Sequence, residues 1–226
     1  MSVEEEKYRA VAEIETYLSN LRKARPSVAL AAAHSAKAAA TITQILDAGR
    51  RVFTRDGHAG LSLRKVADDA GVAVGNVSYY FETKRALIEA ILAEALADYV
   101  EAHIRHFEAD KQSPLEILLN VVTFYVSNAR ENHALFFHMW GFAASAPEAR
   151  DLIRRLYRPI GRFIYFLVRA ARPDASDERV REIVLHLFSL EEGMKLFIGM
   201  GPADNSALLS AETHMRTLAR RIILAD

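Results

Sequence analysis

Three polar side chains near one another in the sequence, Asn76, Ser78 and Tyr79, could form hydrogen bonds with the edges of DNA bases. They surround Val77, which stands four residues before Phe81, so these two apolar residues share one face of a helix. Burial of that face turns the polar side chains outward. Asparagine can form two hydrogen bonds with adenine, and a hydroxyl group can bond to several base edges. The spacing therefore favours a helix that reads a DNA groove, although it also fits a helix whose polar face is only solvated.

Catalytic chemistry has little support in the sequence. The chain has no cysteine, which excludes a thiol nucleophile, a disulfide and a cysteine zinc site. It contains no nucleophile elbow, Walker loop or complete dinucleotide fingerprint. His103 and His106 could share a helix face as metal ligands, but no third ligand accompanies them. We expect no enzymatic activity, no metal and no cofactor; the alternative, an all-helical enzyme built on His138 or His186, lacks an identifiable catalytic partner.

The charge of the chain is unevenly distributed. The formal net charge of the 226 residues is zero, but residues 22–90 hold eleven basic and six acidic side chains. A basic segment in a neutral chain fits one surface that meets phosphate while the rest stays neutral. This excess of basic residues does not by itself show that the protein binds nucleic acid.

Targeting and membrane signals are missing from the sequence. The first six residues are acidic and form no signal peptide, and the most apolar window, residues 134–146, is too short to cross a bilayer. We therefore expect a cytoplasmic protein without membrane contact.

Apolar residues recur at steps of three and four, which predicts an all-α protein. An amphipathic helix covers residues 4–24, and an alanine-rich stretch from residue 28 leads into a second helix that ends at Asp56-Gly57. Further helices are predicted over residues 63–70, 74–81, from 83 onward, from Pro114, from Pro147, from Ser176, and over 206–224.

Two of these helices, residues 63–70 and 74–81, form a helix-turn-helix around Ala70-Gly71-Val72, where glycine permits a sharp corner. The surrounding string resembles the DNA-binding signature of the TetR (tetracycline-repressor) family without a gap over about residues 41–92. The matching residues are Gly57, Leu61-Ser62, Val66-Ala67, Ala70-Gly71-Val72, Gly75, Tyr80-Phe81, Lys84 and Leu87. The resemblance implies an N-terminal helix-turn-helix DNA-binding domain followed by a larger helical domain that binds a ligand and forms the dimer.

The resemblance also implies a set of DNA-binding residues. Arg64 would reach a base or a phosphate, and Tyr80 and Lys84 would hold phosphates, which position the protein without reading sequence. The full set is Ser62, Arg64, Val74, Gly75, Asn76, Ser78, Tyr79, Tyr80 and Lys84. The chain departs from the family at Ala73, where serine is common and would cap the helix, and at Asn76 and Ser78. The resemblance therefore does not predict which bases it prefers.

The second half of the chain is rich in aromatic residues. Such residues at helical spacing usually form a buried core, and the alternative is a largely apolar ligand pocket between helices. The candidates for ligand binding are Phe124, Phe137, Trp140, Tyr157 and Tyr165.

We therefore expect a DNA-binding transcriptional regulator, a repressor released from its operator by a small, largely apolar effector. Its domains would be an N-terminal extension (1–40), a DNA-binding domain (41–92) and a ligand-binding and dimerisation domain (93–226). A homodimer on double-stranded, near-palindromic DNA would form through the helices at 177–198 and 206–224. The apolar residues expected there are Val180, Ile183, Val184, Leu187, Leu190, Leu208, Leu209, Met215, Leu218 and Ile222. Two alternatives stay open, a constitutive DNA-binding protein without a ligand and, for residues 4–24, a solvated tail instead of a packed helix.

Overall fold

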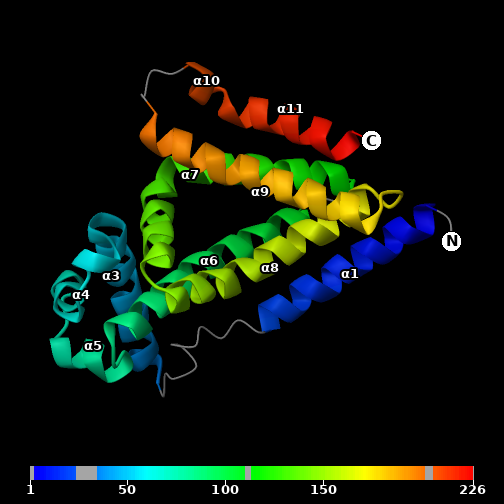
Figure 1. Cartoon of the computed structure of the whole chain (residues 1–226). Coiled ribbons are helices and arrows are strands. Elements are labelled where there is room, and N and C mark those ends of the chain that lie inside the picture. Colours follow the sequence, from blue (N-terminus) through cyan, green and yellow to red (C-terminus); the bar gives the residue numbers. More distant parts are fainter. Residues whose placement is uncertain (1–2, 24–34, 110–112, 202–205, 226) are drawn as a thin grey trace. The chain divides into compact units, whose positions relative to one another are not determined.

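The computed structural model describes residues 3–23, 35–109, 113–201 and 206–225, and these ranges contain helices and short connections but no strand (Figure 1). The predicted all-α class is therefore confirmed. The helices are α1 (Val3–Lys23), α3 (Ala36–Gly60), α4 (Leu63–Ala70), α5 (Val74–Tyr80), α6 (Lys84–Ala109), α7 (Pro114–Ser145), α8 (Pro147–Ala171), α9 (Asp177–Met200), α10 (Ser206–Leu209) and α11 (Ala211–Leu224). None of the described helices has the length and apolar character needed to cross a membrane. The side chains of His103 and His106 and residues 24–34 lie outside the described residues.

Short polar side chains begin several of the helices, as the sequence predicts. Ser62 Oγ accepts a hydrogen bond from Lys65 N at 3.2 Å, and Ser176 Oγ accepts one from Arg179 N at 3.1 Å. Helices α7 and α8 begin at Pro114 and Pro147, where the missing amide hydrogen costs nothing. These boundaries are confirmed.

Two helix boundaries differ from the expectation. Helix α3 runs three residues past Gly57, whose backbone (φ 67°, ψ −177°) leaves the helical region before Leu61 N bonds to Gly57 O at 3.1 Å and closes another turn. The helix predicted over 206–224 is two helices, because Ser210 (φ −104°, ψ 19°) breaks the regular backbone. The first half, α10, holds four residues.

The chain divides into two compact units. The first, here called the bundle unit, comprises residues 1–22, 100–133 and 158–226. The second, the helix-turn-helix unit, comprises residues 23–99 and 134–157. Helices α6, α7 and α8 contribute residues to both units. The division into functional domains at residues 40 and 92 stays a prediction, since these units are defined by packing alone.

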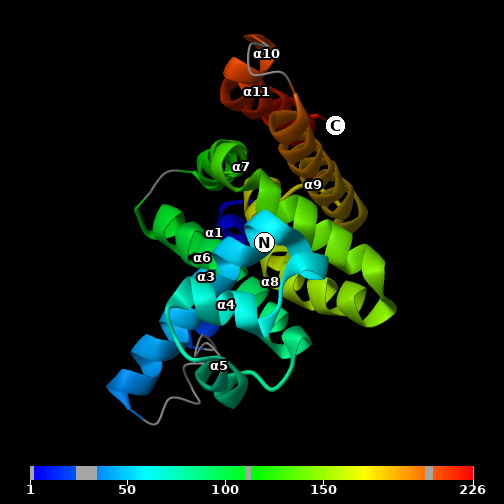
Figure 2. The same ribbon diagram turned by 90° about the vertical axis from the view of Figure 1, so that its left-hand side faces the viewer.

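Close packing of small and branched residues fills the helix-turn-helix unit. Gly49 in α3 faces Ile91 in α6, and a β-carbon at position 49 would lie 2.5 Å from Ile91 Cδ1. Val52, Phe53 and Val66 are fully buried. Helix α4 packs against α3, and α5 packs against α4 (Figure 2).

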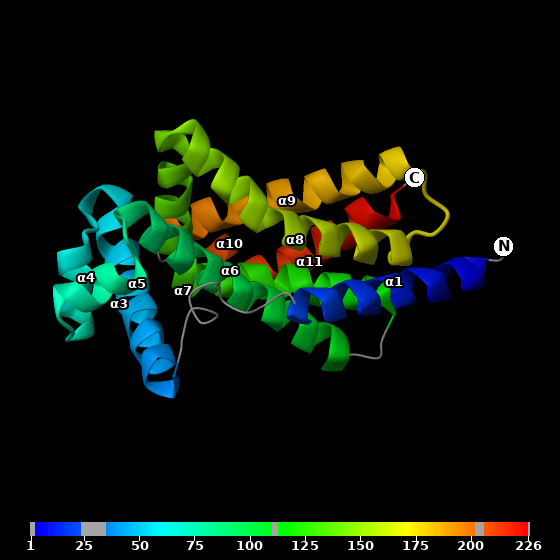
Figure 3. The same ribbon diagram turned by 90° about the horizontal axis from the view of Figure 1, so that it is seen from below.

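The N-terminal helix α1 packs against α8 within the bundle unit (Figure 3). Its residues Ile14 and Leu18 are buried, and Tyr17 Oη donates a hydrogen bond to the carbonyl of Pro159 at 2.9 Å. The Tyr17 ring also contacts Phe166, with centroids 5.4 Å apart. Residues 3–23 are therefore a packed helix, and the alternative of a solvated tail is not supported for them.

Candidate nucleic-acid interface and cavity

The corner between α4 and α5 depends on Gly71. Its φ of 67° lies in the left-handed region that glycine adopts without steric cost. Gly71 N bonds to Asp68 O at 3.3 Å and Val72 N to Ala67 O at 3.0 Å, which ends α4 within one residue. The predicted helix-turn-helix is therefore present with its predicted corner.

Helix α5 presents a polar face to solvent. Val77 and Phe81 are buried at 0% and 5% exposure, as their spacing predicts. Asn76 and Ser78 are exposed, and Tyr79 is 73% exposed, which is unusual for so large an aromatic ring. The helix thus carries hydrogen-bonding groups on a face that the described residues leave exposed to solvent.

The start of α5 is open to a close approach. Ala73 precedes the helix and provides no side-chain cap, as its residue type predicts. Val74 is 40% exposed, and a β-carbon added at Gly75 would meet no atom within 4 Å. Ser78 Oγ bonds to the carbonyl of Val74 at 3.2 Å, so its hydroxyl is held along the helix. A phosphate or base edge could therefore approach the backbone at residues 74–76.

Three further predicted residues surround α5. Tyr80 is half-buried and not fully outward-facing, and its ring meets Tyr79 edge-on with centroids 5.0 Å apart. Lys84 begins α6, and its Nζ donates to the carbonyl of Ala59 at 3.2 Å. Arg64 is exposed on α4. The structure thus places the predicted set on α4 and its N-cap Ser62, on α5 and at the start of α6. Contact of each residue with DNA stays a prediction.

An ion-pair network joins α3 to α4 beside this surface. Asp56 accepts hydrogen bonds from Arg55 Nε and Lys65 Nζ, each at 2.9 Å, and Asp69 pairs with Arg51 at 2.7 Å. The Arg55 and Lys65 hydrogen bonds lower the pKa of Asp56 to about 2. These three basic residues are therefore partly neutralised within the unit, whereas Arg64 and Lys84 stand outside the network.

Comparison with known proteins places this module in a family. The model of the bacterial regulatory proteins of the tetR family matches residues 45–91. The HTH-type transcriptional regulator BetI of Burkholderia thailandensis is 31% identical over 172 residues, which cover 74% of this chain and 86% of that protein. The chain belongs to the TetR family.

This TetR-family protein is a DNA-binding transcriptional regulator. It is also similar to the nicotine-responsive transcriptional repressor HdnoR of Paenarthrobacter nicotinovorans, with 26% identity over 71% of this chain and 84% of that protein. Among solved structures, FadR of Bacillus subtilis in complex with stearoyl-CoA has a TM-score of 0.68 and 19% identity, covering 78% of this chain and 96% of the other. At this identity the likeness shows the shared fold.

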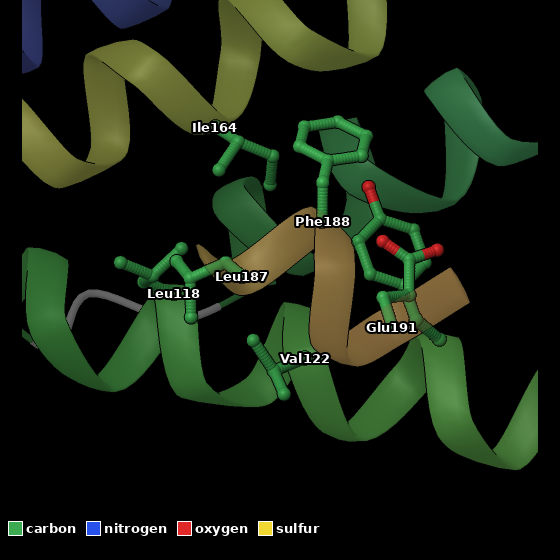
Figure 4. Close-up of a pocket in the computed structure, with 7 residues that line it drawn as sticks. Leu118, Val122, Ile164, Leu187, Phe188 and Glu191 are labelled. Atoms are coloured by element: carbon green, nitrogen blue, oxygen red, sulfur yellow. The ribbon is translucent and has the colours of Figure 1, made fainter. Parts of the chain in front are cut away.

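A small cavity lies in the bundle unit of the TetR-family protein. Side chains of α7, α8 and α9 line it (Figure 4): Leu118, Val122, Tyr125, Ile164, Leu187, Phe188 and Glu191. It has room for about one water molecule. A site for an organic ligand usually measures several hundred Å³, so a ligand could enter only if these helices repack.

A buried ion pair stands at this cavity. Within the described part of the chain, Glu191 and Lys195 are the charged side chains that reach full burial, at 7% and 2% exposure. Lys195 Nζ lies 2.6 Å from Glu191 Oε1 and 3.2 Å from Glu192 Oε1. The same ammonium lies over the Tyr125 ring, 5.8 Å from its centroid. A cation is thus held between two carboxylates and an aromatic face.

Burial and charge act in opposite directions on this pair. Burial raises the pKa of Glu191 to about 7, against the attraction of Lys195. Burial alone would lower the pKa of Lys195, but the two glutamates outweigh it and raise that pKa. Lys195 is therefore an ammonium at neutral pH, and Glu191 is easily protonated.

The five aromatic residues predicted to bind a ligand are not brought together at this cavity. Phe124 and Tyr165 belong to the bundle unit, whereas Phe137, Trp140 and Tyr157 belong to the helix-turn-helix unit. Phe137 and Trp140 contact each other, with ring centroids 5.8 Å apart, and Tyr165 Oη donates to Asp177 at 3.4 Å. None of the five lines the described cavity. Their role in ligand binding stays a prediction.

The burial of Glu191 and Lys195 is not predictable from the sequence. Glu191 and Lys195 stand four apart on a helix, which is the usual pattern of an exposed ion pair. Their burial depends on the packing of α7 against α9, and no local signal reveals it.

The dimer face expected from the sequence is only partly exposed: Leu209 and Leu218 are exposed as predicted, but other members of the set are not. Val180, Ile183, Leu187 and Met215 are buried within the chain, so they are not available to a partner. The reason is that α9 is apolar on two sides, and the side chosen from the sequence faces the core of the bundle unit. The exposed apolar residues, here called the outer α9–α11 face, are Leu185, Leu196, Phe197, Met200, Leu209, Leu218 and Leu224.

Proposed function

We propose that this chain is a repressor that binds a near-palindromic operator as a homodimer in the cytoplasm and leaves it when a small, largely apolar ligand binds. The observation that carries the DNA-binding part is the exposed polar face of α5, with Asn76, Ser78 and Tyr79 outward over a buried Val77. The related proteins are regulators by name, and we propose no catalytic activity.

Each DNA contact follows from side-chain chemistry. We assign the first turn of α5, Val74 to Asn76, to the floor of the major groove, with Asn76 as the side chain able to read adenine. Arg64 would contact guanine or a phosphate from α4. Lys84 has three N–H donors and uses one of them on Ala59 O, so two stay available for a phosphate.

The outer α9–α11 face supports the homodimer. Seven large apolar side chains, each at least 40% exposed, lie on α9, α10 and α11. Apolar exposure on neighbouring helices marks an interface, and a second copy offers a matching apolar face by symmetry. A dimer presents two α5 helices, which suits half-sites about one helical turn, or a multiple of it, apart.

Two observations support ligand control. FadR of Bacillus subtilis, which shares the fold, is crystallised with stearoyl-CoA, and the relative HdnoR is a nicotine-responsive repressor by name. In this chain the cavity in the bundle unit lies between α7, α8 and α9, and α7 and α8 continue into the helix-turn-helix unit. A ligand that prefers an opened cavity shifts the population toward that conformer, and its differential affinity sets the effect on DNA.

The test begins with operators selected by the wild-type protein from a random duplex library. Asn76→Ala should lower affinity most at adenine-containing positions of the selected site, while Arg105→Ala, an exposed residue of the bundle unit, should leave binding unchanged. A compound library is then screened for a raised melting temperature and for DNA release. Compounds that do both support ligand control; a library with no active compound favours a constitutive regulator, which the small cavity also fits.

A further inference from the structure

We infer that the effector carries a positively charged, alkylated nitrogen, and that this group binds between the Glu191 carboxylate and the aromatic rings of Tyr125 and Phe188. The inference rests on the ligand-responsive function proposed above and adds the chemical class of the ligand. Its basis is that the protein already places a cation, the ammonium of Lys195, against Glu191 and the ring of Tyr125.

The lining of the cavity matches an organic cation. Five of the seven lining residues are apolar, and the two with polar groups are Tyr125 and Glu191 (Figure 4). A carboxylate only accepts hydrogen bonds when ionised and attracts positive charge, and aromatic faces attract cations within about 6 Å of the ring centroid. Lys195 Nζ lies 5.8 Å from the centroid of Tyr125, so this aromatic attraction is already in use.

The charge balance favours a cation over an anion. Among the described residues, two carboxylates, Glu191 and Glu192, share the Lys195 ammonium, and full ionisation gives these three groups together a net charge of −1. Buried charge is costly unless it is paired. Burial is the main cause of the high pKa of Glu191, and the charge of Glu192 adds to it. A ligand cation would complete the pairing, whereas an anion would have to displace both carboxylates from Lys195.

Lys195 then acts as an internal competitor for the ligand cation. In the described structure the Lys195 ammonium donates a hydrogen bond to the Glu191 carboxylate. A ligand cation must therefore share that carboxylate with Lys195 or displace the lysine from it. The neighbouring carboxylate, Glu192, lies 3.2 Å from Nζ and can keep Lys195 paired when this happens. Removal of the Lys195 charge should therefore strengthen cation binding. No such gain is expected if the Lys195–Glu191 ion pair only stabilises the fold.

The experiment compares three probes on the full-length protein: two isosteres that differ in charge, and an anion that adds a carboxylate to the same framework. Phenyltrimethylammonium is the cation, tert-butylbenzene is its neutral carbon isostere, and 4-tert-butylbenzoate is the anion. Affinities are measured by calorimetry and by displacement from the selected operator. The variants are Glu191→Gln, Lys195→Met and the double variant Glu191→Gln/Lys195→Met, with Glu131→Gln, an exposed acid on α7, as the matched control.

We expect the wild type and Glu131→Gln to bind the cation at least tenfold more tightly than its isostere. At a pH high enough to keep Glu191 ionised without its lysine partner, Lys195→Met should bind the cation at least tenfold more tightly than the wild type. The preference should vanish in Glu191→Gln and in the double variant, which replaces both charges and keeps the inference testable if a single variant fails to fold.

Equal binding of cation and isostere by both the wild type and Lys195→Met would overturn the inference, as would a cation preference that survives in Glu191→Gln. Preference for the benzoate that depends on Lys195 would identify an anion site instead. If neutral or anionic compounds release DNA and the cation does not, the ligand class is wrong and the proposed function stands. If no compound of any class binds while operator binding is intact, the proposed function itself fails.

Discussion

The imidazole of His138 lies directly over the backbone of Gly57: a β-carbon at position 57 would be 2.6 Å from His138 Nδ1. His138 is in the part of α7 that belongs to the helix-turn-helix unit, and its ring also meets Phe53 edge-on. Gly57 has a positive φ of 67°. Two separate constraints, backbone conformation and ring contact, therefore require glycine at this position.

Gly57→Ala should lower the free energy of unfolding by about 1–3 kcal/mol, because alanine is strained at positive φ and its methyl group displaces the imidazole. Urea unfolding followed by circular dichroism measures the change. Gly141→Ala is the matched control, since a β-carbon there meets no atom within 4 Å. A Gly57→Ala protein as stable as the control would show that the backbone at position 57 and the His138 ring can rearrange at little cost in free energy.

Tyr17→Phe should destabilise the protein by about 1 kcal/mol, the usual contribution of one hydrogen bond, because the carbonyl of Pro159 loses the Tyr17 hydroxyl. Deletion of residues 1–26 should lower the melting temperature further, since Ile14 and Leu18 are buried. Tyr79→Phe, which removes an exposed hydroxyl, serves as the control. An unchanged melting temperature after the deletion would mean that α1 does not contribute to the folded core in solution.

The pairing of Glu212 with Arg130 should make part of the stability dependent on pH. Hydrogen bonds from Arg130, at 2.8 Å from each carboxylate oxygen, lower the pKa of Glu212 from 4.5 to about 2. A lowered pKa in the folded state means that the contribution is complete above pH 4.5 and is lost as the pH falls toward 2.

Glu212→Gln should therefore reduce stability by about 0.5–1 kcal/mol at pH 7, a modest figure because solvent screens the pair. The difference from the wild type should shrink between pH 4.5 and pH 2. Asp151→Asn breaks an exposed pair with Arg154 and should show almost no difference at any pH. A Glu212→Gln effect that is constant over this range would assign it to packing and not to charge.

Leu196→Glu should convert a dimer to a monomer, because it places a charge in the outer α9–α11 face, where Leu196 is 43% exposed. Light scattering at micromolar concentration measures the mass. Ala144→Glu adds the same charge at an exposed position of the helix-turn-helix unit and should stay dimeric. A monomeric wild type would contradict the proposed dimer, and a dimeric Leu196→Glu protein would place the interface elsewhere.

Local signals explain which features the sequence could predict. The corner at Gly71, the cap at Ser62 and the inward pair Val77 and Phe81 each depend on neighbours within a few residues, and the structure has all of them. The break at Ser210 has no such signal, because serine is tolerated within helices and its backbone angle depends on tertiary packing.

In the second half of the chain, the sequence does not predict which apolar side chains are buried and which are exposed. Leu187 and Leu196 are the same residue type on the same helix, yet one is buried and the other is 43% exposed. The choice depends on which side of α9 meets the rest of the bundle unit. For the same reason the burial of Glu191 and Lys195 could not be predicted, since their spacing in the sequence is that of a surface ion pair.

The most direct test of the account measures operator affinity against salt concentration for the wild type, Lys84→Ala, Arg64→Ala and the control Arg105→Ala. A basic residue that contacts a phosphate releases about one counterion, so Lys84→Ala should weaken binding on all sequences and reduce the slope of log K against log salt by about one. Arg64→Ala should weaken binding without unfolding the protein, and Arg105→Ala should match the wild type. Unchanged affinity and slope in both Lys84→Ala and Arg64→Ala would contradict the claim that this face of the helix-turn-helix unit binds DNA.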